Sequence, residues 1–298
     1  MTIDFEIRPL TLEEMATPIS WAKAEGWNPG ISDKDAFWKT DPNGFLGGFL
    51  DGEPVAVISA VRYEGFDDQH QRGNFGFIGF YIVHPDHRGK PYAVRLARAG
   101  MAHLSGIDSI GIDGVLERQE NYKAFGFIYA HRNGRHQGQL PLQGHAPNLN
   151  NQESICQASQ VDFEALCQFD AEHFPTNRRK FLELWINQQD HRCLTITGGK
   201  ENEILAFGVI RPCFDGYKIG PLFARQKTYA ESLIHALCDG LPAQSSFYID
   251  VPTNNDEAVQ LTQQLGMEMV FETARMYRGP APELRTREIF GITTFELG

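Results

Sequence analysis

The feature that most constrains the fold is an internal duplication, because both halves of the chain present the same series of predicted elements. The first half predicts a hairpin over 44–64, a strand over 74–83, a helix over 92–104, a strand over 109–115 and a helix ending in Gly126-Phe127. The second half predicts a hairpin over 193–212, a strand over 216–224, a helix over 228–241, a strand over 246–251 and a helix ending in Gly266-Met267. The letters agree too, since SIGID in the first half corresponds to FYIDV in the second. A repeat of this length indicates two copies of one architecture.

A helical region precedes each hairpin. In the first half, Leu12, Met15, Ile19 and Ala22 recur at spacings of three and four, and the stretches 159–174 and 177–188 do the same in the second half. We therefore predict an α/β (α+β) chain of two tandem domains, each a mixed, mostly antiparallel sheet flanked by helices, with a late strand-helix-strand crossover.

The domain boundary is predicted from composition. Residues 136–153 are rich in Gly, Pro, Gln and Asn and have almost no apolar periodicity. We place an N-terminal domain at 1–137, a linker at 138–153 and a C-terminal domain at 154–298.

Charge and hydropathy limit the classes of molecule that the protein can bind. Lys plus Arg number 27 against 38 Asp plus Glu, for a net charge of −11, and no basic run is long enough to bind a polyanion. This argues against nucleic acid and mildly favours a cationic small molecule. No signal-like segment or membrane-length apolar run occurs, so we expect a soluble, cytoplasmic protein with no membrane partner, and the five cysteines are expected to be buried free thiols.

The stretch HPDHRGKPYAVRLARAG, residues 84–100, joins a predicted strand to a predicted helix. A helix N-terminus offers unpaired backbone N–H groups and a positive dipole end, which suit a phosphate. Arg88 and Lys90 add charge, Gly89 permits close approach, and Ala93 keeps the first turn narrow. Pro91 lacks an N–H and is common at the first helical position. The residues alone leave open whether the turn binds an anion or only connects two elements.

The same stretch resembles motif A of the GNAT superfamily, the acyl-CoA-dependent N-acetyltransferases, which reads Arg/Gln-x-x-Gly-x-Gly/Ala after a strand. Arg88 and Ala93 match, and Pro91 departs. The order of elements in the first half also matches the family. The second half resembles the C-terminal domain of a tandem GNAT subgroup through 219–224 (IGPLFA), Asn254-Asn255 and 275–279 (RMYRG), and more loosely through Asp170, Asn177 and Arg178, which a capped amphipathic helix would also explain.

The resemblance implies transfer of an acetyl group from acetyl-CoA, the co-substrate, to an amine, with no metal. In this family the strand before the loop splays from its neighbour and its backbone pairs with the pantetheine arm. The positions implied for cofactor binding are Tyr81, Ile82, Val83, Arg88, Gly89, Lys90, Pro91, Tyr92, Ala93 and Asn121. Because Pro91 has no donor, pyrophosphate binding is expected to weaken by about 1.5–3 kcal/mol at most.

The resemblance also implies a proton donor for the leaving thiolate. A tyrosine four residues before the glycine of the closing Gly-Phe often serves, and Tyr122 has that position. The alternative is that Tyr122 only packs its helix against the sheet. Asn121 is expected to be either a helix cap or a pantetheine contact.

No general base can be named from the sequence. The long strand carries no carboxylate; Glu64, Asp67, Asp68, Glu117 and Glu120 lie in the flanking segments. His84 is expected to be either a titrating group or a turn residue. With His87 it forms HxxH, but without a third ligand at fixed spacing a metal site is not predicted.

The second half has no glycine in the corresponding loop, 224–232, and carries Thr262 where the acid is expected. We therefore expect it to lack its own CoA site and to shape the acceptor pocket or an interface. The predicted function is an N-acetyltransferase (EC 2.3.1 class) acting by direct attack on a primary amine of a small metabolite, an amino acid or a peptide or protein lysine. The alternatives are a non-catalytic acyl-CoA sensor and a scaffold without ligand; the oligomeric state is not predicted.

Overall fold

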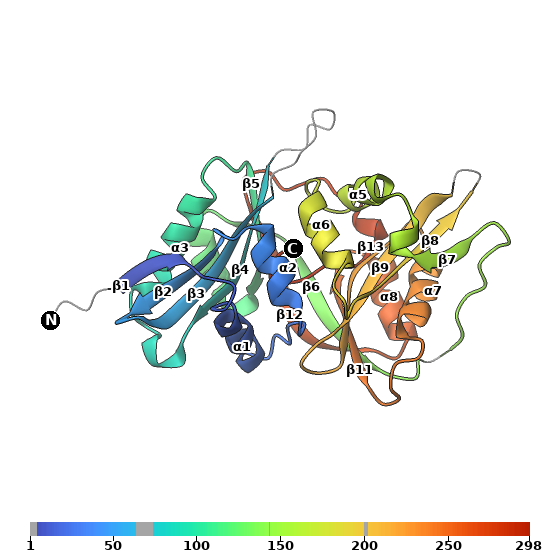
Figure 1. Ribbon diagram of the computed structural model, residues 1–298, viewed down its shortest axis with the longest axis horizontal. Coiled ribbons are helices and arrows are strands. Elements are labelled where there is room, and N and C mark those ends of the chain that lie inside the picture. The colour runs from blue at the N-terminus through green and yellow to red at the C-terminus, as the bar shows by residue number, and fades with distance from the viewer. Residues whose placement is uncertain (1–4, 64–73, 143, 200–201) are drawn as a thin grey trace.

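The computed structural model describes residues 5–63, 74–142, 144–199 and 202–298. Within them the predicted duplication is confirmed: each half builds strands and helices in the same order (Figure 1). The two halves lie side by side, with β1 at the outer edge of one half and the C-terminus between the halves.

The N-terminal half contains the predicted hairpin, strand-helix-strand unit and final helix, with three further strands or helices that the pattern did not predict: β1, α2 and β6. Its elements are β1 Phe5–Pro9, α1 Ala16–Ala24, α2 Asp33–Thr40, β2 Phe45–Leu50, β3 Glu53–Tyr63, β4 Phe75–Val83, η1 Pro85–His87, α3 Tyr92–His103, β5 Ser109–Val115, η2 Leu116–Arg118, α4 Gln119–Ala124 and β6 Ile128–Gln139.

The C-terminal half follows the same plan and adds a short last strand. Its elements are β7 Ser154–Gln157, η3 Ala158–Gln160, α5 Phe163–Ala171, α6 Arg179–Ile186, β8 Arg192–Gly198, β9 Glu203–Pro212, β10 Tyr217–Ala224, α7 Lys227–Cys238, β11 Ser246–Pro252, α8 Asp256–Gln264, β12 Glu268–Arg278, η4 Thr286–Glu288 and β13 Ile289–Gly291.

The halves exchange a strand. The sheet order is β1-β2-β3-β4-β5-β12-β6-β11-β10-β9-β8-β7, so β12 of the second half pairs with β5 of the first, and β6 of the first pairs with β11 of the second. The two sheets thereby become one, joined by β12 and β6 in the middle (Figure 1). Strand β6 ends at Gln139, so it crosses the predicted domain boundary at 137 and enters the predicted linker. The sheet is continuous at this point, and the division into two domains at 137 and 138 stays a prediction.

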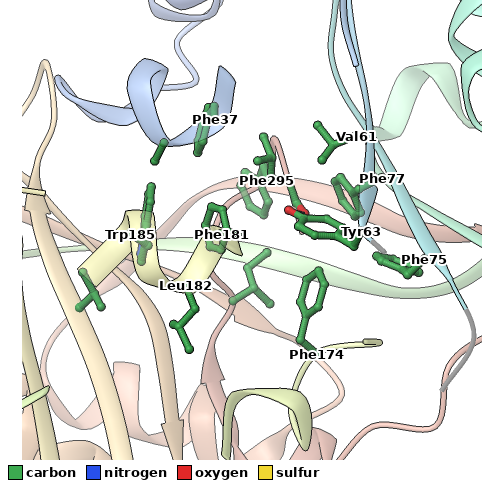
Figure 2. Packing of buried hydrophobic residues seen from close by; sticks show 14 of the residues in the cluster. Phe37, Val61, Tyr63, Phe75, Phe77, Phe174, Phe181, Leu182, Trp185 and Phe295 are labelled. Carbon is green, nitrogen blue, oxygen red and sulfur yellow. The ribbon is translucent and has the colours of Figure 1, made fainter. Parts of the chain in front are cut away.

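Aromatic side chains fill the space between the halves (Figure 2). Phe37 of α2 stacks on Trp185 of α6 with ring centres 5.9 Å apart, and Tyr63 of β3 meets Phe174 edge-on at 5.0 Å. Burial of each such ring stabilises the folded state by about 1.5–3 kcal/mol. The interface is therefore a shared hydrophobic core, and the halves form one folding unit.

The last residues of the chain, 292–298, run through this interface and are all buried. Their main chain touches one strand of each half: a Cβ added at Gly220 of β10 would lie 2.4 Å from the Thr293 oxygen, and one at Gly79 of β4 would lie 2.1 Å from the Glu296 oxygen. Glycine at both positions allows this close backbone approach.

The state of the cysteines and the length of the apolar helices were both expected from composition. All five cysteines are free, with Cys156 half-buried and the other four buried. Among the described helices none is long and apolar enough to span a bilayer.

Candidate active site

The candidate site is built on β4 and β5, which run parallel and are paired only from Phe75 with Ser109 to Ile78 with Ile112. Beyond that point β4 continues to Val83 and β5 to Val115 without pairing to each other. We call this place the N-terminal fork. The splayed strands expected from the family resemblance are therefore present.

Backbone direction decides which groups face the fork. A bulge at Phe80, whose φ is +42°, shifts the register of β4 against β3, and the ladder then resumes with Val57 opposite Ile82. The N–H of His84 donates to the Val55 oxygen at 2.9 Å, on the β3 side. Because successive residues of a strand alternate in direction, the backbone groups of Val83 and Tyr81 point to the fork and those of Ile82 point to β3.

The loop after β4 forms η1, turns at Gly89 with φ +78°, and enters α3. Pro91 takes the N-cap position, one residue before the first helical position, and its carbonyl accepts from the N–H of Arg95 at 3.1 Å. The amides of Tyr92 and Ala93 lie in the first turn of a helix, where no intrahelical acceptor exists. The loop thus presents backbone donors without intrahelical acceptors directly after Pro91.

Charged side chains of the loop are exposed and partly engaged. The Nε of Arg88 donates to the Val83 carbonyl at 3.1 Å, which is one of the backbone groups facing the fork. The same guanidinium forms an ion pair with Glu25 after α1. Lys90 Nζ lies 3.4 Å from His87 Nδ1 and is otherwise open to solvent. One lone pair of the Val83 carbonyl is therefore already used by Arg88, and the other stays available to a second donor.

Two tyrosines meet on the α3 side of the fork. Tyr81 donates its hydroxyl to the Ala93 carbonyl at 2.7 Å. The ring of Tyr122, on α4, packs on Gly114 of β5, where an added Cβ would lie 2.1 Å from it. Burial raises the pKa of Tyr122 to about 12, and burial followed by the Tyr122 hydroxyl raises the pKa of Tyr81 to about 12. Both phenols therefore remain protonated at neutral pH.

The remaining predicted residues lie at the rim. Asn121 is exposed in the interior of α4, whose N-cap is Arg118, so the helix-cap interpretation is wrong. His84 is half-buried, with its ring 5.5 Å from Trp21 and its Nδ1 3.7 Å from an Asp86 oxygen. Within the described residues, no group of three His, Cys, Asp or Glu side chains is placed to hold a metal ion.

The structure also locates the carboxylates considered as bases. Glu117 and Glu120 are exposed, and Glu120 pairs with Lys123. Glu64, Asp67 and Asp68 lie outside the described residues. Neither Glu117 nor Glu120 is held against the fork.

Sequence reasoning missed Asp113, the first residue of β5 beyond the fork's last pair. Its carboxylate is buried and accepts from Arg275 Nε and Nη2 at 2.8 and 2.6 Å and from Asn133 Nδ2 at 2.7 Å. Arg275 is on β12, directly opposite Asp113 in register. The available signal was a single carboxylate in the otherwise apolar strand SIGIDGV. Its three donors fix the closed end of the fork and leave it no role as a base.

The C-terminal half has an equivalent fork, which is filled. Strands β10 and β11 pair in parallel from Tyr217 with Phe247 to Ile219 with Ile249. Beyond that, β13 pairs with β10 at Leu222 and Phe223, and the N–H of Ile292 donates to the Asp250 carbonyl of β11 at 2.9 Å. The chain's own backbone therefore occupies the place that remains unpaired between β4 and β5.

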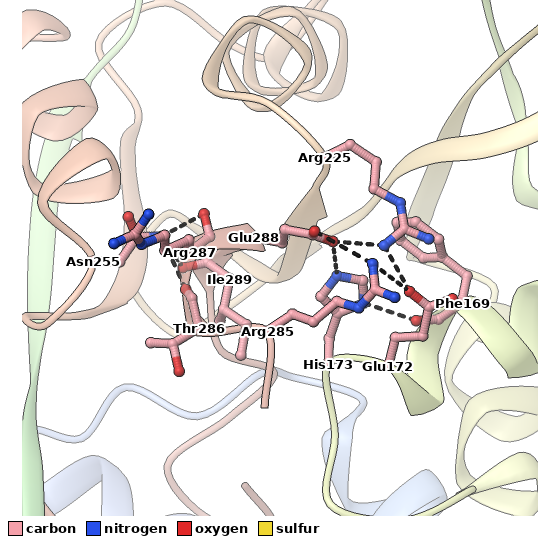
Figure 3. A network of polar contacts seen from close by, with 10 residues as sticks. All are labelled: Phe169, Glu172, His173, Arg225, Asn255, Arg285, Thr286, Arg287, Glu288 and Ile289. Carbon is pink, nitrogen blue, oxygen red and sulfur yellow. Dashed lines mark hydrogen bonds and ion pairs between the residues drawn. The ribbon is translucent and has the colours of Figure 1, made fainter. Parts of the chain in front are cut away.

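Polar contacts hold this inserted segment (Figure 3). Asn255, which caps α8, donates to the carbonyls of Thr286, Arg287 and Ile289 at 3.1, 3.2 and 2.9 Å. Arg225, directly after β10, pairs with Glu288 at 2.7 Å and with Glu172 at 2.6 Å.

A buried pair holds the segment that follows. Arg178 donates to Asp170 through Nε and Nη2, both at 2.8 Å, and Nη2 also donates to Thr293 Oγ1 at 2.8 Å. The polar residues that resemble the C-terminal-domain motifs thus hold the inserted strand and the chain after it.

Known proteins agree with this architecture. Residues 10–131 match the "Acetyltransferase (GNAT) family" and residues 166–291 match an "Acetyltransferase (GNAT) domain". The chain is 30% identical over 291 residues to the holothin acyltransferase of Pseudoalteromonas sp. (strain SANK 73390), covering 98% of this chain and 94% of that protein. The chain therefore belongs to the GNAT family, as a tandem member, and is an acyltransferase that uses acyl-CoA.

Solved structures show the same fold. A putative acetyltransferase from Pyrococcus horikoshii superposes with a TM-score of 0.80 at 20% identity, covering 99% of this chain and 96% of that one. A tandem GNAT protein from the clavulanic acid biosynthesis pathway superposes with a TM-score of 0.64 at 11% identity, covering 93% and 100%. The predicted tandem fold is therefore confirmed.

Proposed function

We propose that the N-terminal fork binds acetyl-CoA and that the enzyme transfers the acetyl group to the primary amine of a small molecule by direct attack. The observation that carries the proposal is the contrast between the forks: β4 and β5 are unpaired beyond Ile78 and Ile112, whereas the equivalent place in the other half is filled by β13.

The donor would be held by backbone groups and a helix end. Pantetheine contains amides, which suit the fork-facing groups of Tyr81 and Val83, and Ile82 contributes through the strand that positions them. Pyrophosphate suits the loop from Arg88 to Ala93, where Gly89 leaves space and the amides of Tyr92 and Ala93 are free. The side chain of Arg88 would leave the Val83 carbonyl and bind the phosphates. Asn121, which is exposed, is proposed to contact the pantetheine.

The proposed chemistry needs one proton donor and one acceptor. The amine lone pair forms the C–N bond, the C–S bond breaks, and the thiolate takes a proton. Tyr122 supplies that proton, because its raised pKa of about 12 keeps the phenol protonated. Its hydroxyl has no hydrogen-bond partner among the described residues, which leaves it available to the sulfur.

The acceptor is proposed to be a small molecule. A relative that aligns over nearly the full length of the chain is by name a holothin acyltransferase, and we take a small-molecule acceptor from that name. The net charge of −11 favours association with a protonated amine through its long-range field.

Calorimetry with acetyl-CoA and a thiol-release assay over a panel of small primary amines test the proposal. We expect binding of one acetyl-CoA per chain and CoA release that depends on the amine. Absence of binding at millimolar acetyl-CoA would contradict the proposal. Binding without release for any amine would instead favour the sensor.

A further inference from the structure

The tail of the chain carries a buried carboxylate with no partner. Glu296 is 2% exposed, and neither of its carboxylate oxygens has a hydrogen-bond partner among the residues that the structure describes. A buried carboxylate without a donor is costly, so such a group invites a functional explanation.

The cations around Glu296 bond to other groups, except that Arg211 Nη1 has no hydrogen-bond partner among the described residues. Arg135 on β6 is bonded to Asp250 at 2.7 and 2.8 Å, Arg211 on β9 to Asp33 of α2 at 2.8 Å, and Lys218 on β10 to the Asn28 carbonyl at 2.8 Å. Burial raises the pKa of Glu296 above its ordinary value, although Lys218, Arg135 and Arg211 oppose this and Asp33 adds to it. The cations thus attract the carboxylate without bonding to it.

The main chain of Glu296 lies against the closed end of the N-terminal fork. Its carbonyl packs on Gly79, which follows the last paired residue, Ile78, and it accepts from Ser59 Oγ at 3.4 Å. Ile78 packs with Leu96 of α3, whereas Phe77 and Phe80 pack on the opposite face, with the interface core. Side chains alternate along a strand, so Glu296 lies on the face opposite α3.

Two of the cations that act on Glu296 also contact the connection between α1 and α2. Lys218 and Arg135 donate to the carbonyls of Asn28 and Trp27 in that connection. Glu296 is thus linked to β4 through the contact of its main chain with Gly79, and to this connection through the cations that act on it. A donor bound at the fork from the α3 side would meet an acceptor here from the other side.

We propose that Glu296 is the proton acceptor for the attacking amine, an inference that rests on the proposed function. The neutral amine forms the C–N bond and passes one proton to the Glu296 carboxylate. The C–S bond breaks, and the thiolate takes the Tyr122 proton. Glu296 then loses its proton to water and Tyr122 regains one, so protons balance over the cycle.

Other buried carboxylates are already satisfied. Asp113, Asp250 and Asp33 each accept two hydrogen bonds from an arginine, so their carboxylate oxygens already have partners. Among the described carboxylates, Glu296 combines burial with two unpartnered oxygens.

Glu296→Gln tests the role because it keeps shape and removes basicity. With acetyl-CoA and an amine that the wild type turns over, we expect kcat/KM to fall about 10²- to 10⁴-fold. Acetyl-CoA affinity and thermal unfolding serve as checks on folding. Glu268→Gln, on an exposed carboxylate of β12, is the matched control and should keep the wild-type rate.

The pH profile separates a base from a structural residue. The ionised form is active, so kcat/KM should rise with pH through a pKa above the ordinary value of 4.5. The profile is measured with two amines of different pKa. The rise that comes from an enzyme group falls at the same pH for both amines, whereas a rise that comes from the amine shifts with the amine's pKa. Glu296→Gln should lose the rise that comes from the enzyme group, and Glu296→Asp should keep it with a lower rate.

The outcomes are distinct. A folded Glu296→Gln with the wild-type rate and pH profile would overturn the role of Glu296 and leave the proposed function intact. If Glu296→Gln does not fold, an unchanged rate in Glu296→Asp would overturn the role of Glu296 as the proton acceptor. A wild type that turns over no amine overturns both proposals.

Discussion

The two forks of the molecule share their geometry and differ in what occupies them. In each, two parallel strands part after a short ladder, a glycine follows the last pair, and an aspartate on the second strand bonds an arginine of the exchanged strand. Those pairs are Asp113 with Arg275 and Asp250 with Arg135, both directly opposite in register. Only the C-terminal fork contains a strand of the protein itself.

The difference indicates how one copy of a duplicated fold would lose a binding site without losing its structure, if the open fork is the acetyl-CoA site as proposed. An extended backbone can satisfy the exposed edge of β10, as peptides do when they add to a sheet. The anchors for β13 come from Asn255, Arg225 and Glu288. The C-terminal half therefore gains stability from an edge that stays unpaired in the N-terminal half, where we propose that acetyl-CoA binds.

Replacing the proposed acid should have the largest effect. Tyr122→Phe removes the proton donor, and we expect turnover to fall about 10²- to 10⁴-fold in the thiol-release assay while acetyl-CoA affinity is kept. Thr262→Val changes the corresponding residue of the other half and should leave turnover unchanged. Equal rates for wild type and Tyr122→Phe would show that Tyr122 only packs its helix.

Breaking the buried aspartate–arginine pair at the closed end of either fork should have the next largest effect. Arg275→Met and Arg135→Met each leave a buried aspartate without its partner, so we expect each to lower the free energy of unfolding by about 3–5 kcal/mol. Arg132→Met breaks an exposed pair with Glu272 and should cost less than about 1 kcal/mol. Urea unfolding measures all three. A small loss from one buried pair alone would show that the two closed ends are not equivalent.

Loosening the filled fork should have an intermediate effect. Burial acts to raise the pKa of Glu288, but hydrogen bonds from Arg225 and His173 outweigh it and lower that pKa. Glu288→Gln should cost about 1–3 kcal/mol at pH 7. Because the folded-state pKa is depressed, this difference is full above pH 4.5 and disappears as the pH falls through the folded-state value.

Thermal unfolding as a function of pH measures the effect of Glu288→Gln. Calorimetry on the same variant should still show a single acetyl-CoA site, because the loop after β10 has no glycine turn. A second site would mean that β13 alone excludes the ligand. A difference that stays constant at every acidic pH at which both proteins still fold would contradict the ion-pair explanation.

Straining the open fork's loop should affect binding more modestly. Gly89 has φ +78°, a conformation that costs an alanine about 1–2 kcal/mol. In free Gly89→Ala the exposed loop can relax out of this conformation, and restoring it on binding should weaken acetyl-CoA binding by about 5- to 30-fold in calorimetry. Gly106→Ala introduces the same strain at φ +81° outside this loop and should lower stability without changing affinity. Equal affinities for both variants would place the phosphates elsewhere.

Restoring the missing donor should have the smallest effect. Pro91 is exposed at the N-cap of α3, and Pro91→Gly adds an N–H at a cost in loop entropy of about 0.4–1 kcal/mol. We expect acetyl-CoA binding to range from unchanged to about tenfold tighter. A large loss of affinity would show that the proline shapes the loop and that counting donors is wrong.

Much of the fold could be predicted because its signals are local. Apolar alternation identified β4 and β5, helical periodicity identified α3 and α7, and the repeat showed that the halves share a plan. The exchanged strands were missed since β6, with RNGRHQGQ, is polar and glycine-containing and is buried only by neighbours from the other half. For the site, the loop and Tyr122 were predicted. Asp113 acquires its role only from Arg275 and Asn133, which are far along the chain, and Glu296 only from its burial between the two halves.

By itself the sequence determined the duplicated α/β plan, the helix-start loop around Gly89, and the absence of a matching loop in the second half. These follow from periodicity, turn chemistry and composition, which act over a few residues. Only the tertiary structure decided which fork is open, because β13 and the tail reach β10 and Gly79 through pairing between distant segments. It also decided which carboxylates are satisfied, since hydrogen-bond partners in a buried interface depend on how the two halves pack.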